Sequence, residues 1–481
     1  MKTVMMNTKK IIICLGITGI SLVYTACIGP SFARKENKKV PESYNNLKDS
    51  TNTAKIKWKD FFTDPNLVAL IDTALKNNQE LNMMIQEINV AKQEVRARKG
   101  AYLPTVGVGI GGGVDKVGLY TSRGASDAAN DITPGQKVPD VLPNYLLGLN
   151  ASWEVDIWKK LRNSKKAAAM RYLASIEGKN FMVTNLIAEI ANSYYELMAL
   201  DNRLEILKQN INLYQNSLEI VKLEKQSARV TELAVRRFEA EVLKNQSRQY
   251  YIEQQIVEAE NRINFLVGRF PQPVVRDSKS FSNLLVDTIH SGIPSQLLSN
   301  RPDIKQAERQ ITAANLDIRA TKADFYPSLR ITAGGGFGAF NPAYLIKSPQ
   351  SLIFSLAGDL VAPLINRNAI KANYYSANSK QVQAVYNYER AILNAHIEVV
   401  NKLSSINNLK KSYDLKSKQV QALTEAIDIS NTLFKSARAD YMEVLLTQRD
   451  ALESRFELIE TKMQQMNARV GIYRALGGGW R

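Results

Sequence analysis

The feature that most restricts the fold of this 481-residue chain is an internal duplication. A Leu-Pro element ending at Pro104 precedes alternating apolar residues and three glycines at 111–113, and a Tyr-Pro element ending at Pro327 precedes the same pattern and glycines at 334–336. Three further pairs of similar segments follow in the same order, 207 or 209 residues apart: 147–149 with 354–356, 228–231 with 437–440, and 266–268 with 475–477. A shared order over this length predicts two copies of one structural unit.

Each copy contains a long stretch without helix-breaking residues. Residues 159–267 contain no proline and one glycine, Gly178, and residues 364–470 contain neither. The change to short or turn-tolerant residues at 228–231 and 437–440 predicts a tight turn between two antiparallel helices in each copy. A helix over 163–227 would be about 100 Å long. Each copy is therefore expected to contain a long helical hairpin.

The apolar residues of these stretches form narrow seams. They recur at three-and-four spacing and are separated by polar residues, as in the series Ile187, Ile190, Ala191, Tyr194, Leu197 and Met198. Such seams are typical of long helices that pack side by side. Taken alone, they would also fit an ordinary coiled coil.

Four shorter segments alternate apolar residues with polar or small ones, a pattern that predicts β-strands. They are 106–110, 147–157, 329–337 and 352–360. Strands of about ten residues can cross a bilayer obliquely. Four strands cannot close a barrel, and open sheet edges are not tolerated in lipid, whereas three chains would supply twelve strands. A soluble sheet packed on helices is the alternative.

The amino terminus predicts export. Two lysines precede an apolar run over 11–23 that is too short to span a membrane, and 24–27 read Tyr-Thr-Ala-Cys. This segment resembles a bacterial lipoprotein signal, which implies that 1–26 are removed, that Cys27 carries the lipid, and that the following Ile28 directs the protein to the outer membrane. Residues 27–57 are then expected to form a tether. A conventional signal peptide cut at another position is the alternative.

The net charge of +17 does not indicate nucleic-acid binding. Basic residues alternate with acidic ones along the predicted helices, as in Glu219, Lys222, Glu224 and Lys225, which favours a solvated helix surface. The two histidines, His290 and His396, are too few for a metal triad or a Ser/His/Asp set. We therefore expect no enzyme activity, no cofactor, no metal site and no nucleic-acid partner.

Two short motifs carry a family resemblance. Arg301-Pro302-Asp303 resembles a signature of outer-membrane efflux proteins of the TolC type, and Gly477-Gly478-Gly479-Trp480 resembles the carboxyl end of the lipoprotein branch that serves multidrug efflux pumps. The resemblance covers about 58–480. It divides the chain into a first repeat over 58–270, a linker over 271–293 and a second repeat over 294–481.

The resemblance implies a mainly α-helical protein with a membrane β-barrel. Three chains would form a 12-stranded outer-membrane barrel that continues into a helical tunnel through the periplasm. The homotrimer would be the passive exit duct for a periplasmic adaptor protein and an inner-membrane pump of the RND type. A lipid-anchored periplasmic coiled-coil scaffold or adhesin stalk is the alternative.

The resemblance also assigns residues. The two hairpin turns would contact the adaptor through Arg229, Val230, Thr231, Glu232 and Leu233 of the first and Arg438, Ala439, Asp440, Tyr441 and Met442 of the second. Glu443 would form a periplasmic gate ring, although a solvated position is the alternative and the family's second acidic position is Leu446 here. Ala228 and Ala437 replace glycines common at these turns. The pore is expected to be lined by polar residues such as Asn150, Ser152 and Glu154, and 121–143 to form a longer surface loop.

Overall fold

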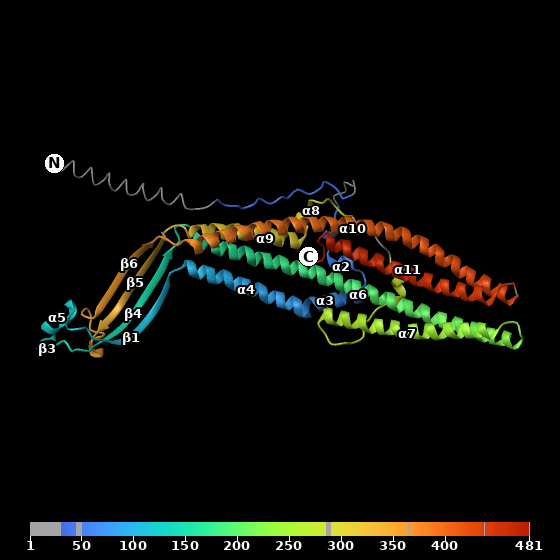
Figure 1. The fold of residues 1–481 in the computed structure, drawn as a ribbon, viewed down its shortest axis with the longest axis horizontal. Helices are drawn as coiled ribbons and strands as arrows, with labels where there is room; N and C mark the ends of the chain where they lie inside the picture. Colours follow the sequence, from blue (N-terminus) through green and yellow to red (C-terminus); the bar gives the residue numbers. More distant parts are fainter. Residues whose placement is uncertain (1–29, 45–50, 285–289, 364, 437, 481) are drawn as a thin grey trace. The chain divides into compact units, whose positions relative to one another are not determined.

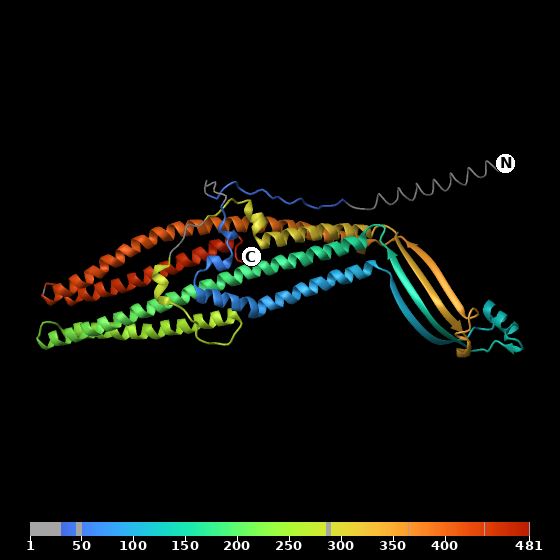
Figure 2. The ribbon, with the colours of Figure 1, turned by 180° about the vertical axis from the view of Figure 1, so that it is seen from behind.

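The computed structural model describes residues 30–44, 51–284, 290–363, 365–436 and 438–480 (Figures 1 and 2). Cys27 and Ala437 lie outside the described residues. The chain divides into two compact units. One contains Val90–Tyr172 and Arg309–Val385 with the described part of Met1–Lys35, and the other contains Glu36–Asn89, Leu173–Glu308 and Tyr386–Arg481. Both copies of the duplication contribute to each unit.

The order of the elements repeats as the duplication predicts. The first copy contains η1 (Thr53–Lys55), α2 (Trp58–Phe61), α3 (Pro65–Asn77), α4 (Gln79–Tyr102), β1 (Thr105–Asp115), α5 (Ser122–Ala129), β2 (Asp131–Thr133), β3 (Gln136–Lys137), β4 (Leu142–Val155), α6 (Lys160–Gln226) and α7 (Glu232–Val267). The linker and second copy contain η2 (Ser278–Asn283), α8 (Gln296–Asn300), α9 (Pro302–Ala323), β5 (Ser328–Ala339), η3 (Pro342–Tyr344), β6 (Leu352–Val361), α10 (Asn368–Lys435) and α11 (Tyr441–Ala475).

The two predicted helical hairpins are α6 with α7 and α10 with α11. Helix α6 has 67 residues and α10 has 68, because neither contains a proline that would interrupt it. At the end of α6, the Arg229 amide donates to the Glu224 carbonyl and the Ala228 amide donates to the Lys225 carbonyl, each at 2.9 Å. This pattern is a Schellman cap, and it holds Ala228 in the left-handed region at φ 56°.

The four predicted strands form one antiparallel sheet in the order β1-β4-β5-β6. Val108 of β1 lies opposite Leu149 of β4, which in turn lies opposite Gly335 of β5. The β4 and β5 strands belong to different copies, so the sheet joins the two repeats. The strands β1 and β6 are its two edges.

The insertion between β1 and β4 has structure that the sequence reasoning did not predict. Within the expected loop 121–143 it contains the helix α5 and the β2–β3 hairpin. The Thr121 hydroxyl caps α5 by accepting from the Gly124 amide at 3.1 Å. A Cβ on Gly124 would lie 2.1 Å from the Gly118 carbonyl oxygen, so this close approach requires glycine.

The largest hydrophobic cluster lies in the unit that contains α3, α7 and α11. All six residues of the predicted seam in α6 are buried in it: Ile187, Ile190, Ala191, Tyr194, Leu197 and Met198. The Tyr194 hydroxyl donates to Asp64 at 2.8 Å, and Asp64 also caps α3 by accepting from the Asn66 amide at 2.8 Å. The seam therefore serves as the core of this unit.

The two short family motifs contact each other. Arg301 is buried; its Nη1 donates to the Ala475 carbonyl at 2.8 Å and to Glu398 at 2.9 Å, and its Nη2 donates to Asp303 at 2.8 Å. Gly477 ends α11 at φ 88°, and a Cβ there would lie 2.8 Å from the Asn300 backbone. The Trp480 indole donates to the Asn300 carbonyl at 3.2 Å. Together these residues fasten the end of the chain to the start of α9.

Candidate functional site

The sheet has one continuous apolar face. Because the strands pair in register, Val108, Leu149, Ala333 and Leu356 belong to one side of it. The full face comprises Val106, Val108, Ile110 and Val114 of β1, Leu147, Leu149, Ala151, Trp153 and Val155 of β4, Leu329, Ile331, Ala333 and Phe337 of β5, and Leu352, Phe354, Leu356 and Leu360 of β6. The alternation predicted from sequence is thus shared by all four strands.

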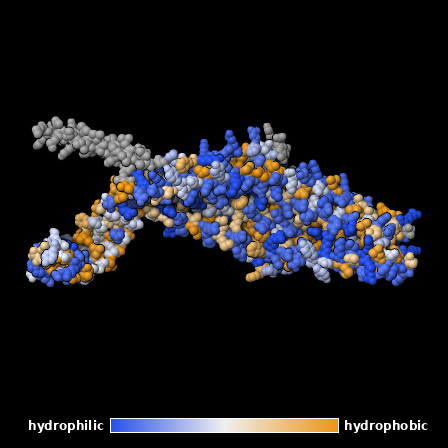
Figure 3. All heavy atoms as spheres, viewed as in Figure 1, coloured by the Kyte–Doolittle hydropathy of each residue, from blue (hydrophilic) through white to orange (hydrophobic). Residues whose placement is uncertain are grey.

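Much of this apolar face is open. Val108 is 72% exposed and Phe354 is 86% exposed, and the orange surface in Figure 3 follows the strands. A monomeric soluble protein rarely exposes a contiguous apolar patch of this kind. Among the described residues, no helix is both long and apolar enough to cross a membrane.

The opposite face of the sheet is mostly polar or small, with Leu146 of β4 and Ile353 and Val361 of β6 as apolar exceptions. It carries the predicted residues Asn150, Ser152 and Glu154 of β4, and Asn150 pairs with Gly107 while Ser152 pairs with Thr105. Glycines take most of the remaining positions on this face in β1 and β5. A face of small and polar groups can border water, whereas contact of the apolar face with water is unfavourable in free energy.

Two tryptophans mark the end of the sheet next to the long helices. The Trp153 indole donates to the Tyr102 carbonyl at 3.2 Å, and the Trp158 indole donates to the Pro327 carbonyl at 2.8 Å. The Trp158 ring also stacks on Tyr326 with centroids 4.6 Å apart. Tryptophan and tyrosine are favoured where a membrane protein meets the headgroup layer, because one part of each side chain is apolar and one is polar.

The first hairpin turn exposes most of its predicted contact residues. Arg229, Thr231, Glu232 and Leu233 are exposed, and Val230 is half-buried. Glu232 forms ion pairs with Lys225 and Arg236. The hydrogen bond from Lys225 lowers the pKa of the Glu232 carboxyl. The structure adds an exposed residue that the sequence did not indicate, Leu223 of α6, which is 62% exposed; Leu233 of α7 is 56% exposed.

The second turn packs against the first. A cluster of Tyr214, Leu218, Val221, Ala234, Val235, Phe238, Val242, Val444 and Leu445 joins the two hairpins, and Val230, Tyr441 and Met442 pack on it. Arg438 and Asp440 are exposed, whereas Ala439, Tyr441 and Met442 are half-buried. An ion pair of 2.6 Å between Arg248 of α7 and Glu453 of α11 also joins the hairpins. The two sets of predicted contact residues therefore lie together.

Glu443 lies in the first turn of α11. Its side chain is exposed, while the next two residues, Val444 and Leu445, are buried in the shared cluster. Within the described residues its carboxylate makes no ion pair. Leu446, at the family's second acidic position, is also exposed. The Glu443 carboxylate is thus available at this end of the second hairpin, as is that of the exposed Asp440.

The described tether is bound to the helices by side-chain amides. Asn378 Oδ1 of α10 accepts from the Ser31 hydroxyl at 2.9 Å and from the Phe32 amide at 3.1 Å. Gln381 accepts from the Arg34 amide at 2.9 Å and donates to its carbonyl at 2.7 Å. In the other unit, Lys38 pairs with Glu308 at 2.7 Å. These contacts were not foreseen from the sequence.

Comparisons with known proteins agree with this architecture. A family model described as outer membrane efflux protein matches residues 70–269 and 293–478. The pyoverdine export outer membrane protein OpmQ of Pseudomonas aeruginosa is 27% identical over 424 residues, which are 88% of this chain and 87% of that protein. The cation efflux system protein CusC of Escherichia coli is 26% identical over 471 residues, which are 96% and 98% of the two chains.

A solved structure has the same fold. The crystal structure of the open state of the Neisseria gonorrhoeae MtrE outer membrane channel is similar with a TM-score of 0.81 and 24% identity, covering 94% of this chain and 99% of that one. The two ranges matched by the family model also coincide with the two copies of the duplication. The chain belongs to the outer membrane efflux protein family.

Proposed function

We propose that this outer-membrane efflux protein assembles as a homotrimer, and that three sheets close into one 12-stranded barrel above a helical duct. The exposed apolar face of the sheet carries this proposal. That face needs an apolar surrounding, and the edge strands β1 and β6 need partners if that surrounding is lipid. Pairing β6 of one chain with β1 of the next satisfies both edges, and bacterial barrels of this kind have even numbers of strands, from about eight upward.

The duct has no chemical step. Its outer end would be the barrel, whose polar face, including Asn150 and Ser152, borders the water-filled interior. The relatives are named as an export outer membrane protein and a cation efflux system protein, which supports a transport role. Their names and the family match favour a channel over a periplasmic scaffold or adhesin stalk.

The hairpin turns would bind the periplasmic adaptor that links the duct to an inner-membrane pump of the RND type. Their exposed leucines support this assignment, because Leu223 and Leu233 lie beside charged groups and leave apolar area uncovered. Burying two leucines in a partner would contribute about 1.5–3 kcal/mol each. Replacing Leu233 with Asp should reduce adaptor binding by the purified trimer, whereas Leu243→Asp, at an exposed position farther along α7, should not.

Glu443 would form the gate. In a trimer, three copies of an exposed carboxylate at one level of the duct favour cations and bind divalent ions at a constriction. Opening would then require the second hairpins to move apart by hinge or shear motion.

Lipid on Cys27 would anchor the chain to the outer membrane. The contacts of Asn378 and Gln381 with 31–34 support this assignment, because they hold the segment that follows the lipidated residue in an extended path along α10. The lipid would add to the membrane attachment that the barrel provides.

Membrane extraction tests the barrel. The Cys27→Ser variant, expressed with a cleavable signal, removes the lipid, and membranes are then washed with carbonate and urea. The barrel predicts that the trimer stays with the bilayer and conducts ions in a planar membrane. A variant that washes off, or a trimer without conductance, would favour the scaffold.

Single-channel recording tests the gate. Glu443→Gln should weaken block by divalent cations added from the periplasmic side, because the ring loses its charge. Asp428→Asn is the matched control, since Asp428 is an exposed acid on α10 of the same hairpin. Unchanged block in Glu443→Gln would show that this residue is not part of the gate. The conductance of the same variant tests separately whether the protein is a channel.

A further inference from the structure

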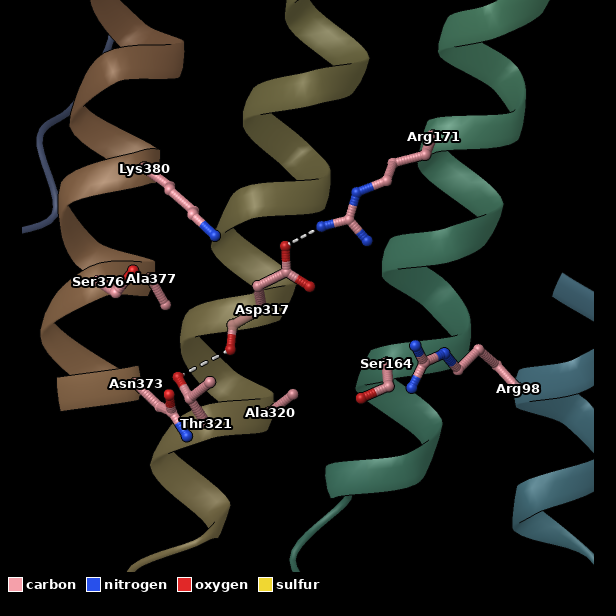
Figure 4. A pocket seen from close by; sticks show the side chains of 10 residues that line it. All are labelled: Arg98, Ser164, Arg171, Asp317, Ala320, Thr321, Asn373, Ser376, Ala377 and Lys380. Atoms are coloured by element: carbon pink, nitrogen blue, oxygen red, sulfur yellow. Dashed lines mark hydrogen bonds and ion pairs between the residues drawn. The ribbon is translucent and has the colours of Figure 1, made fainter. Parts of the chain in front are cut away.

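A basic hollow lies between four helices of the unit that contains the sheet. It has a volume of about 380 Å³ and is lined by Arg98 of α4, Ser164 and Arg171 of α6, Asp317, Ala320 and Thr321 of α9, and Asn373, Ser376, Ala377 and Lys380 of α10 (Figure 4). None of these residues belongs to the barrel face, the hairpin turns or the gate. The four helices that build the hollow come from both copies of the duplication.

Positive charge exceeds negative charge in the hollow. Three of its residues are cations, Arg98, Arg171 and Lys380, and Asp317 is the single acid among the lining residues. Arg171 forms an ion pair with Asp317 through one terminal nitrogen. Figure 4 shows Arg171 and Lys380 reaching toward Asp317 from opposite sides. The lining thus carries a net charge of two positive units.

The cations keep donors that are not used inside the protein. Arg98 donates to Glu94 through Nε at 2.7 Å, which leaves both terminal nitrogens of its guanidinium available. Lys380 has no hydrogen bond or ion pair within the described part of the chain. The neutral side chains of Ser164, Asn373 and Ser376 likewise have no hydrogen-bond partner among the described residues. These groups can donate to the oxygens of a ligand.

The duplication explains how the cations come together. Arg171 and Lys380 are 209 residues apart, the offset that relates the long helices of the two copies, and Ser164 and Asn373 share it. Glu94 and Asp317 are related by the 223-residue offset of the two Pro elements, as are Arg98 and Thr321. In the first copy, the acid Glu94 pairs with Arg98, four residues later on the same helix. The second copy has a threonine there, so its acid pairs with Arg171 from another helix.

We propose that this hollow binds a soluble solute carrying two negative charges on phosphate or carboxylate oxygens. Guanidinium groups present several donors in a plane that matches such oxygens, and an ammonium group adds a mobile positive charge. The apolar lining residues are Ala320 and Ala377, which offer no surface for an acyl chain. A water-soluble oxyanion therefore fits better than a phospholipid headgroup.

Calorimetric titration of the detergent-solubilised trimer with inorganic pyrophosphate tests the proposal. Lys380→Gln and Arg171→Gln should each weaken binding about tenfold or more, as expected when a charged hydrogen bond is lost. Asp317→Asn should instead tighten binding, because it removes the opposing charge. Lys371→Gln, on an exposed part of α10 outside the hollow, should bind as the wild type does.

Two outcomes would overturn the site. Equal binding by all variants would place pyrophosphate elsewhere, and weaker binding by Asp317→Asn would show that the cluster is a structural ion-pair network. Phosphatidylglycerol added to the same micelles tests whether the ligand is a lipid headgroup or a soluble oxyanion. Competition of this lipid with pyrophosphate would contradict a soluble ligand. The titration does not measure conductance, so its result is independent of the duct proposed above.

Discussion

Arg301 and Glu398 form an ion pair of 2.9 Å that joins the residue immediately before α9 to α10. The Arg301 side chain is 7% exposed, and Arg474 of α11 reaches the same carboxylate at 2.5 Å. One glutamate thus links the family's Arg-Pro-Asp motif with the helix that precedes its terminal glycines. This network gives the motif a structural role at the end of the chain.

Arg301→Ala should lower the free energy of unfolding by about 1.5–3 kcal/mol, because Glu398, Asp303 and the Ala475 carbonyl each lose a charged hydrogen bond. Thermal unfolding of the solubilised protein measures the loss. Lys59→Ala, which breaks the exposed pair of Lys59 with Asp72, is the control and should cost less than about 1 kcal/mol. Equal melting of the two variants would contradict the role assigned to Arg301.

The same glutamate predicts acid sensitivity. Burial alone would raise the pKa of Glu398, but hydrogen bonds and charges from Arg301 and Arg474 outweigh it and hold this pKa below its ordinary value of 4.5. The folded state therefore keeps the carboxylate ionised where the unfolded chain would protonate it. The stability that the network supplies is present above pH 4.5 and is lost as the pH falls through the lowered pKa.

Melting curves of Glu398→Gln and wild type, compared from about pH 6 to about pH 3.5, check this sign. The difference between the two proteins should shrink as the pH falls. A difference that stays constant over that range would show that ionisation of Glu398 does not contribute.

Ala228→Gly should stabilise the first hairpin by about 1 kcal/mol, since a left-handed backbone is strained for alanine and is accessible to glycine. The gain appears as a higher melting temperature. Gly268→Ala is the reverse test and should lower the melting temperature. Gly268 has φ 78°, and a Cβ there would lie 2.5 Å from the Asn77 carbonyl oxygen. No gain in Ala228→Gly would contradict the strain assigned to Ala228.

Charges on the two faces of the sheet should have different effects. Phe354→Arg places a charge on the apolar face and should cost about 2–4 kcal/mol if that face meets the middle of the bilayer. Ser355→Arg, one residue later on the opposite face, should be tolerated. Trimer recovered from outer-membrane fractions is the measurement, and equal recovery of the two variants would contradict the assignment of the faces.

Local patterns were sufficient to predict the long helices and the strands. The absence of proline allowed α6 to be placed within three residues of its observed start, and alternation placed the strands, because both signals arise from neighbours in the chain. The turn at 228–231 was also foreseen, although its Schellman cap and strained alanine were not. The buried seam of α6 followed from its spacing.

Contacts between distant segments could not be predicted in this way. Helix α5 has only eight residues, most of them small, and its cap and the close packing of Gly124 on Gly118 depend on the folded insertion. The binding of 31–34 by Asn378 and Gln381 joins residues 346 or 347 positions apart. Likewise, nothing in the local sequence of α9 indicates that Asp317 pairs with Arg171.

The pairing of β4 with β5 has a consequence for the origin and assembly of the protein. These strands are the last of one copy and the first of the next, and they match residue for residue from Tyr145 opposite Ala339 to Val155 opposite Leu329. In a half-length ancestor the same strands would have belonged to separate molecules, whose meeting depended on concentration. In the duplicated chain that meeting is intramolecular, across a connection that runs through α6, α7, α8 and α9. Assembly of the ring then requires fewer encounters, and the two halves are free to diverge.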